Sequence, residues 1–170
     1  MTNKKVLYLA GGCFWGLEKA LSFLDGVIET TVGYANGNTT NPTYEEVCSD
    51  KTGFKEAVEV IYDADILPIN KLVEAFFICI DPTLKNRQGN DIGSQYQTGI
   101  YYIQKEDKEI LEAIFNGKRQ NYDSFYVELE PLSNYYAAED YHQDYLQNNP
   151  GGYCHISKKE FDEIKELKGR

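Results

Sequence analysis

The sequence predicts an α+β fold, a two-layer α/β plait with a ferredoxin-like core in which helices cover a mixed sheet. Two observations support this prediction. Apolar segments with strand periodicity alternate with amphipathic helical segments in the order β-α-β-(short α)-β-α-β. No linker and no internal repeat divides the 170 residues, so residues 1–170 are expected to form a single domain. A doubly wound parallel sheet is the alternative.

The first half of the chain supplies three strands and two helices. The apolar residues of the first helix recur every three or four positions from Phe14 to Leu24, and Asp25-Gly26 ends it. Thr43 and Glu46 have the spacing of a capping box, which predicts a short helix. The expected strands are 5–10, 27–35 and 54–63.

The second half begins with an apolar helix at 70–80 and a polar loop at 81–94. Amphipathic periodicity then predicts a helix at 105–117, and a charged helix starts at Lys158. Strands are expected at 97–103 and 124–132, a further helix at 137–148, and a loop at 149–157.

Composition excludes several classes of function. The formal net charge is −10 and the basic residues are scattered, so nucleic-acid binding is not expected. No apolar run reaches the ~20 residues that span a bilayer, and the run at 6–10 is too short for a signal peptide, so no membrane association and a cytoplasmic location are expected. The four cysteines form no C-x-x-C pair, so neither a metal site nor a disulfide framework is predicted.

The stretch GGCFWGLE indicates a reactive thiol at Cys13. This cysteine follows a strand and two glycines and opens a helix, where backbone N–H groups and the helix dipole favour an anion. We therefore expect a lowered thiol pKa and a nucleophilic cysteine. Phe14 and Trp15 follow directly and offer an apolar wall for a small apolar or sulfur-bearing group. A buried structural cysteine is the alternative interpretation.

Glu56 is a candidate general acid. In the strand FKEAVEVIY a period of two places it on one face with Phe54, Val58, Val60 and Tyr62. Desolvation on such a face would raise its pKa. A shift of one residue in register would instead leave it in water beside Lys55, and the pattern alone does not decide between the two.

Further candidates are Tyr44, Tyr96 and Cys154, which lie where elements begin or on a glycine-rich loop. A thiol on such a loop can reach a partner sulfur, as a resolving cysteine must. Cys79 lies in the apolar run FFICI and is expected in the core, and Cys48 has no assigned role.

Five ordered segments resemble one protein family. The segments, which run from Gly11 to Cys154, are GGCFWGLE, NPTYEEVCS, TGFKEAVEV, QGNDIGSQY and YYAAEDYHQDYLQNNPGGYC. They are similar to those of the peptide methionine sulfoxide reductases of the A type. The resemblance implies a single catalytic domain that reduces the S epimer of methionine sulfoxide, free or in proteins, and so repairs oxidised proteins without a cofactor.

The resemblance also implies a role for each candidate. Cys13 would be the nucleophile and Glu56 the acid, while Tyr44 and Tyr96 would bind the sulfoxide oxygen. The substrate backbone would contact Asp91, and its methyl group would contact Phe14 and Trp15. Cys154, on the loop at 149–157, would convert the Cys13 sulfenic acid to a disulfide that thioredoxin reduces.

Two features depart from the family pattern. Phe54 stands where the family usually has histidine, close to the acid, which leaves the surrounding water structure and the pH dependence open. The tail is a charged helix without the second recycling cysteine of many members, so one resolving step is expected.

Three other functions use the same residues. A cysteine hydrolase would pair Cys13 with His142 or His155, oriented by an acid such as Asp140. A thiol peroxidase would direct the same cysteines at hydrogen peroxide. A non-catalytic binding module would use only the wall of Phe14 and Trp15.

Overall fold

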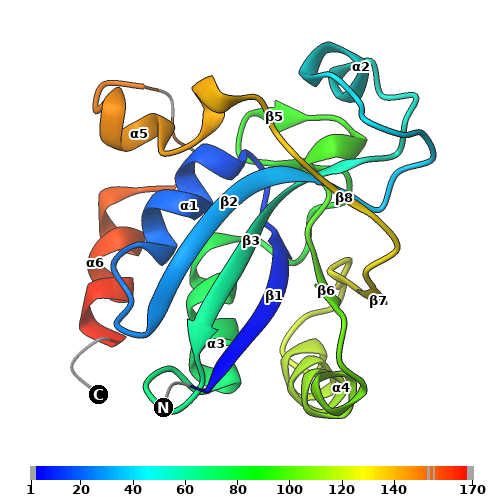
Figure 1. Cartoon of the computed structure of the whole chain (residues 1–170). Coiled ribbons are helices and arrows are strands. Elements are labelled where there is room, and N and C mark those ends of the chain that lie inside the picture. The colour runs from blue at the N-terminus through cyan, green and yellow to red at the C-terminus, as the bar shows by residue number, and fades with distance from the viewer. Residues whose placement is uncertain (1–2, 153, 155, 168–170) are drawn as a thin grey trace.

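The computed structural model describes residues 3–152, 154 and 156–167, and its centre is an antiparallel sheet (Figure 1). The four central strands are β1 (Lys4–Ala10), β2 (Val27–Ala35), β3 (Lys55–Asp63) and β6 (Gly99–Tyr102), in the spatial order β6-β1-β3-β2. Helix α1 (Phe14–Leu21) joins β1 to β2, and α3 (Ile69–Cys79) joins β3 to β6. This double βαβ arrangement confirms the ferredoxin-like core, and the doubly wound alternative is wrong because the central strands pair antiparallel.

Two short strands extend this core into a mixed sheet. β7 (Glu128–Pro131) pairs parallel with β6, and β8 (Tyr135–Ala137) pairs antiparallel with β2. The full order is therefore β7-β6-β1-β3-β2-β8. The expected strand at 124–132 is present but shorter. Strand β8 ends at Ala137, the position where the pattern had predicted the start of a helix.

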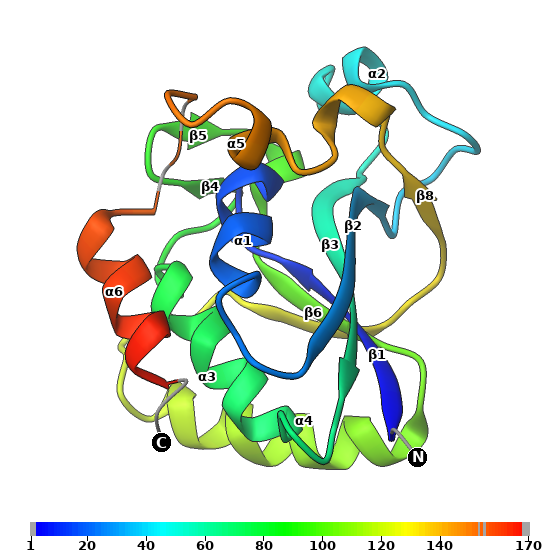
Figure 2. The same cartoon turned by 60° about the vertical axis from the view of Figure 1, so that its left-hand side comes forward.

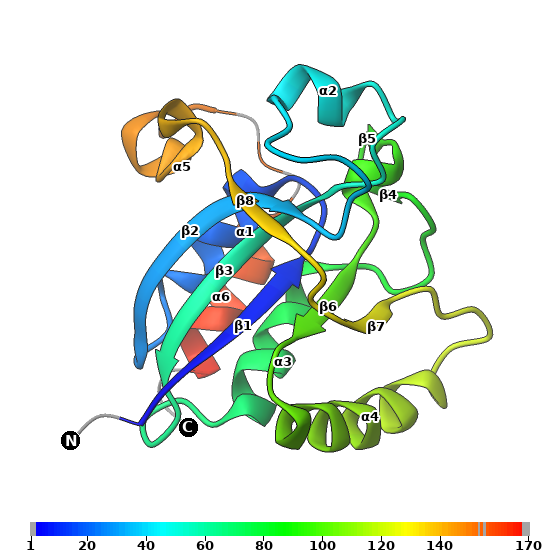
Figure 3. The same cartoon turned by 45° about the vertical axis from the view of Figure 1, so that its right-hand side comes forward.

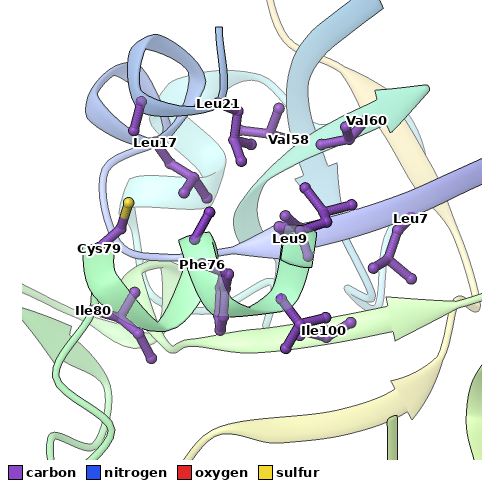
Figure 4. Packing of buried hydrophobic residues seen from close by; sticks show 14 of the residues in the cluster. Leu7, Leu9, Leu17, Leu21, Val58, Val60, Phe76, Cys79, Ile80 and Ile100 are labelled. Atoms are coloured by element: carbon purple, nitrogen blue, oxygen red, sulfur yellow. The ribbon is translucent and has the colours of Figure 1, made fainter. Parts of the chain in front are cut away.

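The helices α1, α3 and α6 (Lys158–Leu167) gather on one face of the sheet (Figure 2). Leu17, Leu21 and Phe76 project from α1 and α3 onto Leu9 and Val58 of the strands, and all five are fully buried (Figure 4). Burial of each such side chain stabilises the fold by roughly 1.5–3 kcal/mol. Helix α4 (Lys105–Arg119) contacts α3 and β6 at the periphery.

The other face of the sheet carries a smaller cluster built from tyrosines. Tyr8 and Tyr101 are buried there beside Ala10, Ala35 and Ala57. The two hydroxyls donate hydrogen bonds of 2.7 Å to Glu59 and Glu128, which satisfies their polar ends at the edge of the cluster.

The functional candidates collect at one end of the sheet, where β1 ends and β3 begins (Figure 3). Helix α2 (Tyr44–Cys48) lies at this end, with the capping box between Thr43 and Glu46 that its sequence predicted. The expected polar loop contains a small hairpin of β4 (Arg87–Gln88) and β5 (Asp91–Ile92), followed by the 3₁₀ helix η1 (Ser94–Tyr96).

The expected helix at 137–148 is wrong. The segment forms the end of β8, a 3₁₀ turn η2 (Asp140–His142) and a single turn α5 (Tyr145–Asn148). Gln143 explains the break, because its amide accepts from Val32 N–H at 2.9 Å and donates to the carbonyls of Val32 at 2.9 Å and Ala138 at 3.1 Å. Asp144 then takes a left-handed φ of 51°, which a helix cannot accommodate.

Gln143→Ala is expected to lower the free energy of unfolding by about 1–3 kcal/mol, because the Val32 N–H at the sheet edge loses its partner, while the Val32 carbonyl keeps only its bond from Ala138 N–H. Gln147→Ala, at an exposed position of α5, should change it by less than about 0.5 kcal/mol. Urea unfolding of both variants measures the difference, and equal stabilities would contradict this role of Gln143.

Candidate active site

Cys13 is the N-cap residue of α1, directly after the turn that leaves β1. Gly12 makes the turn with a φ of 81°, a conformation that residues with a side chain rarely adopt. The Cys13 side chain is only 6% exposed. The sequence therefore places the sulfur at the helix start as expected, but in a more buried position than a freely accessible thiolate would occupy.

The electrostatics of Cys13 are the reverse of the expectation. Burial raises the pKa of the thiol, the neighbouring Glu56 carboxylate raises it further, and the backbone N–H of Trp15 only partly offsets this. Asp91 and Cys154 also raise it. The prediction of a lowered pKa was wrong because it counted the helix start and neither the burial of the sulfur nor the carboxylates that the fold brings beside it.

Glu56 lies on the apolar face of β3, which settles the register question that the pattern left open. Its side chain is 1% exposed, and its Oε1 accepts from the backbone N–H of Phe14 at 3.2 Å. Its Oε2 is buried and has no hydrogen-bond partner among the residues that the structure describes. Burial raises the pKa of this carboxyl to about 8, so it holds a proton at neutral pH.

Tyr44, Tyr96 and Asp91 belong to the same site. Burial raises the pKa of both tyrosines, and Glu56 raises each further, so their hydroxyls stay protonated donors. Asp91 and Cys13 also act on Tyr96. Two hydrogen bonds hold the segments that carry these tyrosines. Ser94 N–H, at the start of η1, donates to Asp50 Oδ1 at 2.7 Å, and Tyr44 N–H donates to Glu139 Oε2 at 3.1 Å.

Phe14 and Trp15 form an aromatic wall together with two residues of the C-terminal segment. Trp15 stacks on Tyr145 with ring centroids 3.8 Å apart, and its Nε1–H donates to His142 Nδ1 at 3.1 Å. Phe14 packs against the His142 ring at 5.2 Å. Tyr44 also meets this ring, at 4.6 Å, so the wall continues from the helix start to the oxygen-binding candidates.

His142 therefore serves as part of the wall and not as the base of a hydrolase. Burial lowers its pKa, and its Nδ1 accepts from Trp15 and so carries no proton. Asp140, the proposed orienting acid, is exposed. His155, the other candidate base, lies outside the described residues.

The remaining cysteines occupy distinct environments. Cys154 is half-buried, and its thiol donates to the Ile156 carbonyl at 3.5 Å. Cys79 is buried in the core, as its apolar run predicted. Cys48, to which the sequence gave no role, is exposed on α2, and hydrogen bonds with Tyr44 and Gln95 place it at the margin of the site.

Phe54 fills an apolar slot where the family pattern has histidine. It is fully buried, lies against Gly37 and meets the Tyr136 ring edge-on at 5.8 Å. With Phe54 in this slot, Glu56 two residues later still lies beside Cys13 and accepts from Phe14 N–H.

The sequence did not point to three side chains that hold the segments around the site: Gln143, Glu18 and Glu139. Glu18 Oε1 accepts from Asp144 N–H at 2.7 Å, and its Oε2 accepts from Thr30 Oγ1 at 3.0 Å. Glu139 Oε1 accepts from the Tyr34 hydroxyl at 2.8 Å. For Glu139 and Gln143 the available signal was the polar run YYAAEDYHQDY, but the helical interpretation of that run concealed it.

No group of three or more metal-ligating side chains occurs among the described residues. Within the same part of the chain, no helix is both long and apolar enough to cross a membrane.

Comparison with known proteins gives a consistent result. The model of the family "Peptide methionine sulfoxide reductase" matches residues 5–168. The peptide methionine sulfoxide reductase MsrA of Clostridium acetobutylicum is 52% identical over 157 residues, covering 92% of this chain and 96% of that protein. The crystal structure of reduced Mxr1 from Saccharomyces cerevisiae is 35% identical, with a TM-score of 0.86 over 91% of this chain and 92% of its own. Mxr1 in complex with Trx2 is also similar, at 26% identity and a TM-score of 0.61, covering 84% and 85% of the two chains.

Glu18→Gln should change how stability depends on pH. Burial raises the pKa of Glu18 from 4.5 to about 7, so the folded state binds its proton more tightly than the unfolded chain. Wild-type stability should therefore fall, relative to E18Q, as pH rises from the lower of these values to the higher. We expect a change of about 1–3 kcal/mol over this range.

Chemical unfolding at several pH values measures this difference. Glu29→Gln, at an exposed position of β2, is the matched control and should run parallel to wild type. A constant difference between E18Q and wild type would contradict the raised pKa of Glu18.

Proposed function

Because the chain belongs to the A-type peptide methionine sulfoxide reductase family, we propose that Cys13 and Glu56 together reduce the S epimer of methionine sulfoxide. The reaction transfers the sulfoxide oxygen to the Cys13 sulfur and releases methionine. Such reductases act on one epimer each, which requires a site that distinguishes the methyl group from the oxygen.

One observation carries the assignment of roles. Glu56 is buried beside Cys13, with Oε1 held by Phe14 N–H and Oε2 without a partner among the described residues. A carboxyl with a pKa of about 8 carries a proton at neutral pH and can donate it from the unengaged oxygen. A sulfoxide oxygen is the acceptor that such an acid requires.

The surrounding groups account for the orientation of the substrate. The Tyr44 and Tyr96 hydroxyls would donate to the same sulfoxide oxygen, and the wall of Phe14 and Trp15 would hold the methyl group. Asp91, on the hairpin next to η1, would accept from the substrate backbone. Oxygen and methyl are then bound on different sides of the sulfur, so only one epimer presents its sulfur to Cys13.

Proton transfer from Glu56 makes the substrate sulfur electrophilic. The Cys13 sulfur then bonds to the substrate sulfur. As the hydroxyl moves from the substrate sulfur to Cys13, the substrate's sulfur–oxygen bond and the new sulfur–sulfur bond break, which releases methionine and leaves a Cys13 sulfenic acid. The thiol proton of Cys13 replaces the one that Glu56 gave, so the step consumes no net proton. No metal or organic cofactor takes part in this chemistry.

Cys154 would then complete the cycle. Its thiol condenses with the sulfenic acid to form a Cys13–Cys154 disulfide and water. Mxr1 has been crystallised with the thioredoxin Trx2, which supports thioredoxin as the reductant here. We place the whole cycle in one catalytic domain, residues 1–170, with the loop at 149–157 carrying Cys154, and in the cytoplasm, where such thiols stay reduced.

A single-turnover assay with separate epimers tests the function. Fully reduced protein without reductant should form about one methionine per chain from the S epimer of N-acetyl-methionine sulfoxide and none from the R epimer. Two thiols per chain should disappear in wild type. Cys13→Ser should form none, and methionine from the R epimer or from neither epimer would refute the assignment.

Glu56→Gln tests the acid. The amide cannot donate a proton with the carboxyl's acidity, so methionine formation should slow by about 10²–10⁴-fold. In wild type the rate should fall as pH rises through about 8, because ionised Glu56 is no longer an acid and also raises the pKa of Cys13. E56Q should lack this fall.

Glu59→Gln is the matched control for that experiment. Glu59 lies on the same strand but is bonded to Tyr8 on the other face of the sheet. Rapid-quench measurement across pH should give wild-type rates for E59Q. An equally slow E59Q, or an E56Q as fast as wild type, would remove Glu56 from the role of acid.

A further inference from the structure

Gly16, in the first turn of α1, lies against the sulfur of Cys154. A Cβ atom built at Gly16 would come within 2.8 Å of Cys154 Sγ and 3.3 Å of Ile156 Cδ1. The first of these distances is closer than real side chains approach one another. The space that a side chain would fill at position 16 is therefore occupied by the Cys154 sulfur.

The backbone gives no reason for a glycine at this position. Gly16 is the third residue of α1 and is absent from the residues with positive φ among those described. A glycine there costs about 0.5–1 kcal/mol of helix stability relative to alanine. The absence of a side chain leaves space for the Cys154 sulfur, and we take this contact to offset the loss of helix stability.

The location of this contact matters because Gly16 is three residues after Cys13. Cys13 is the N-cap of α1 and Gly16 is the third residue of the helix, within its first turn. A sulfur resting on Gly16 is thus about one helical turn from its target. The effect of Cys154 on the pKa of Cys13 agrees with this proximity.

The hydrogen bond from Cys154 to the Ile156 carbonyl fixes the other side of the sulfur, at 3.5 Å. Ile156 is itself buried in the core, so the loop is anchored to the core two residues after Cys154. The thiol is therefore held between α1 and its own loop, and the missing side chain of Gly16 determines how closely it approaches the helix.

We infer that Gly16 is a positioning residue for the second step of the reaction, seating the Cys154 thiol beside Cys13. The inference rests on the proposed function. In this step the sulfur–oxygen bond of the Cys13 sulfenic acid breaks and a sulfur–sulfur bond to Cys154 forms. The hydroxyl leaves with the thiol proton as water, so no external oxidant or reductant is needed.

Gly16→Ala separates this step from the first. Methionine formation from the S epimer in a single turnover should remain near wild type, because Cys13 and Glu56 are unchanged. Disulfide formation should slow by about 10- to 100-fold, the effect of displacing a reacting group by roughly 1 Å. The sulfenic acid, trapped with a dione reagent and detected by mass spectrometry, should accumulate, and turnover with thioredoxin should fall.

Gly117→Ala is the matched control. Gly117 lies in α4, and a Cβ there would meet nothing within 4 Å. This variant gains the same helix propensity and should form the disulfide at the wild-type rate. In a Cys154→Ser background, Gly16→Ala should have no effect on the lifetime of the sulfenic acid.

The outcomes separate the inference from the function on which it rests. Absence of methionine from wild-type protein would refute the function. Normal methionine formation with an unchanged or faster disulfide step in G16A would overturn the role of Gly16 alone. Alkylation of Cys154 in the reduced protein gives a second measurement: faster labelling in G16A than in G117A supports displacement of the sulfur, and equal labelling contradicts it.

Discussion

The backbone N–H of Phe14 donates to the buried Glu56 carboxyl, and this bond joins the first turn of α1 to the start of β3. The two bonded residues are 42 positions apart in sequence, and the bond brings the segment of Cys13 next to that of Glu56. A buried carboxyl is costly unless it is bonded or protonated, and Glu56 meets both conditions at neutral pH. The bond uses one oxygen and leaves the other without a hydrogen-bond partner among the described residues. The α1 turn, the β3 register and the acidity of Glu56 therefore depend on a single contact.

The same contact accounts for the electrostatics of Cys13. A helix start favours an anion by roughly 0.3–1 kcal/mol near the surface, whereas burial beside a carboxylate opposes the thiolate more strongly. The thiol pKa is consequently raised, and two negative charges at Cys13 and Glu56 disfavour one another. A protonated Glu56 removes the larger of the carboxylate effects. The protonated state of Glu56 is thus also the state in which the Cys13 thiol is easiest to ionise.

Much of the secondary structure could be predicted from local patterns in the sequence. The bounds of β2 and the capping box of α2 follow from short-range periodicity and spacing, and the five family segments contain every candidate at the site. Contacts between distant segments could not be read in this way. Gln143 ends the expected helix by bonding to Val32, which lies 111 residues earlier, and Cys154 rests on a glycine at the other end of the chain. The hairpin of β4 and β5 is too short for strand periodicity to show.

Glu139 and Glu56, which both act on Tyr44, differ in the number of hydrogen bonds that each carboxyl accepts. Burial opposes ionisation of Glu139, but bonds from Tyr44 N–H and the Tyr34 hydroxyl hold the pKa of its carboxyl below the usual range. Glu56 is more deeply buried, and the one bond it accepts does not prevent a raised pKa. Glu139 therefore remains an ionised acceptor that anchors the aromatic segment to α2. Glu56 instead keeps its proton at neutral pH, and its second oxygen accepts no hydrogen bond from the described residues.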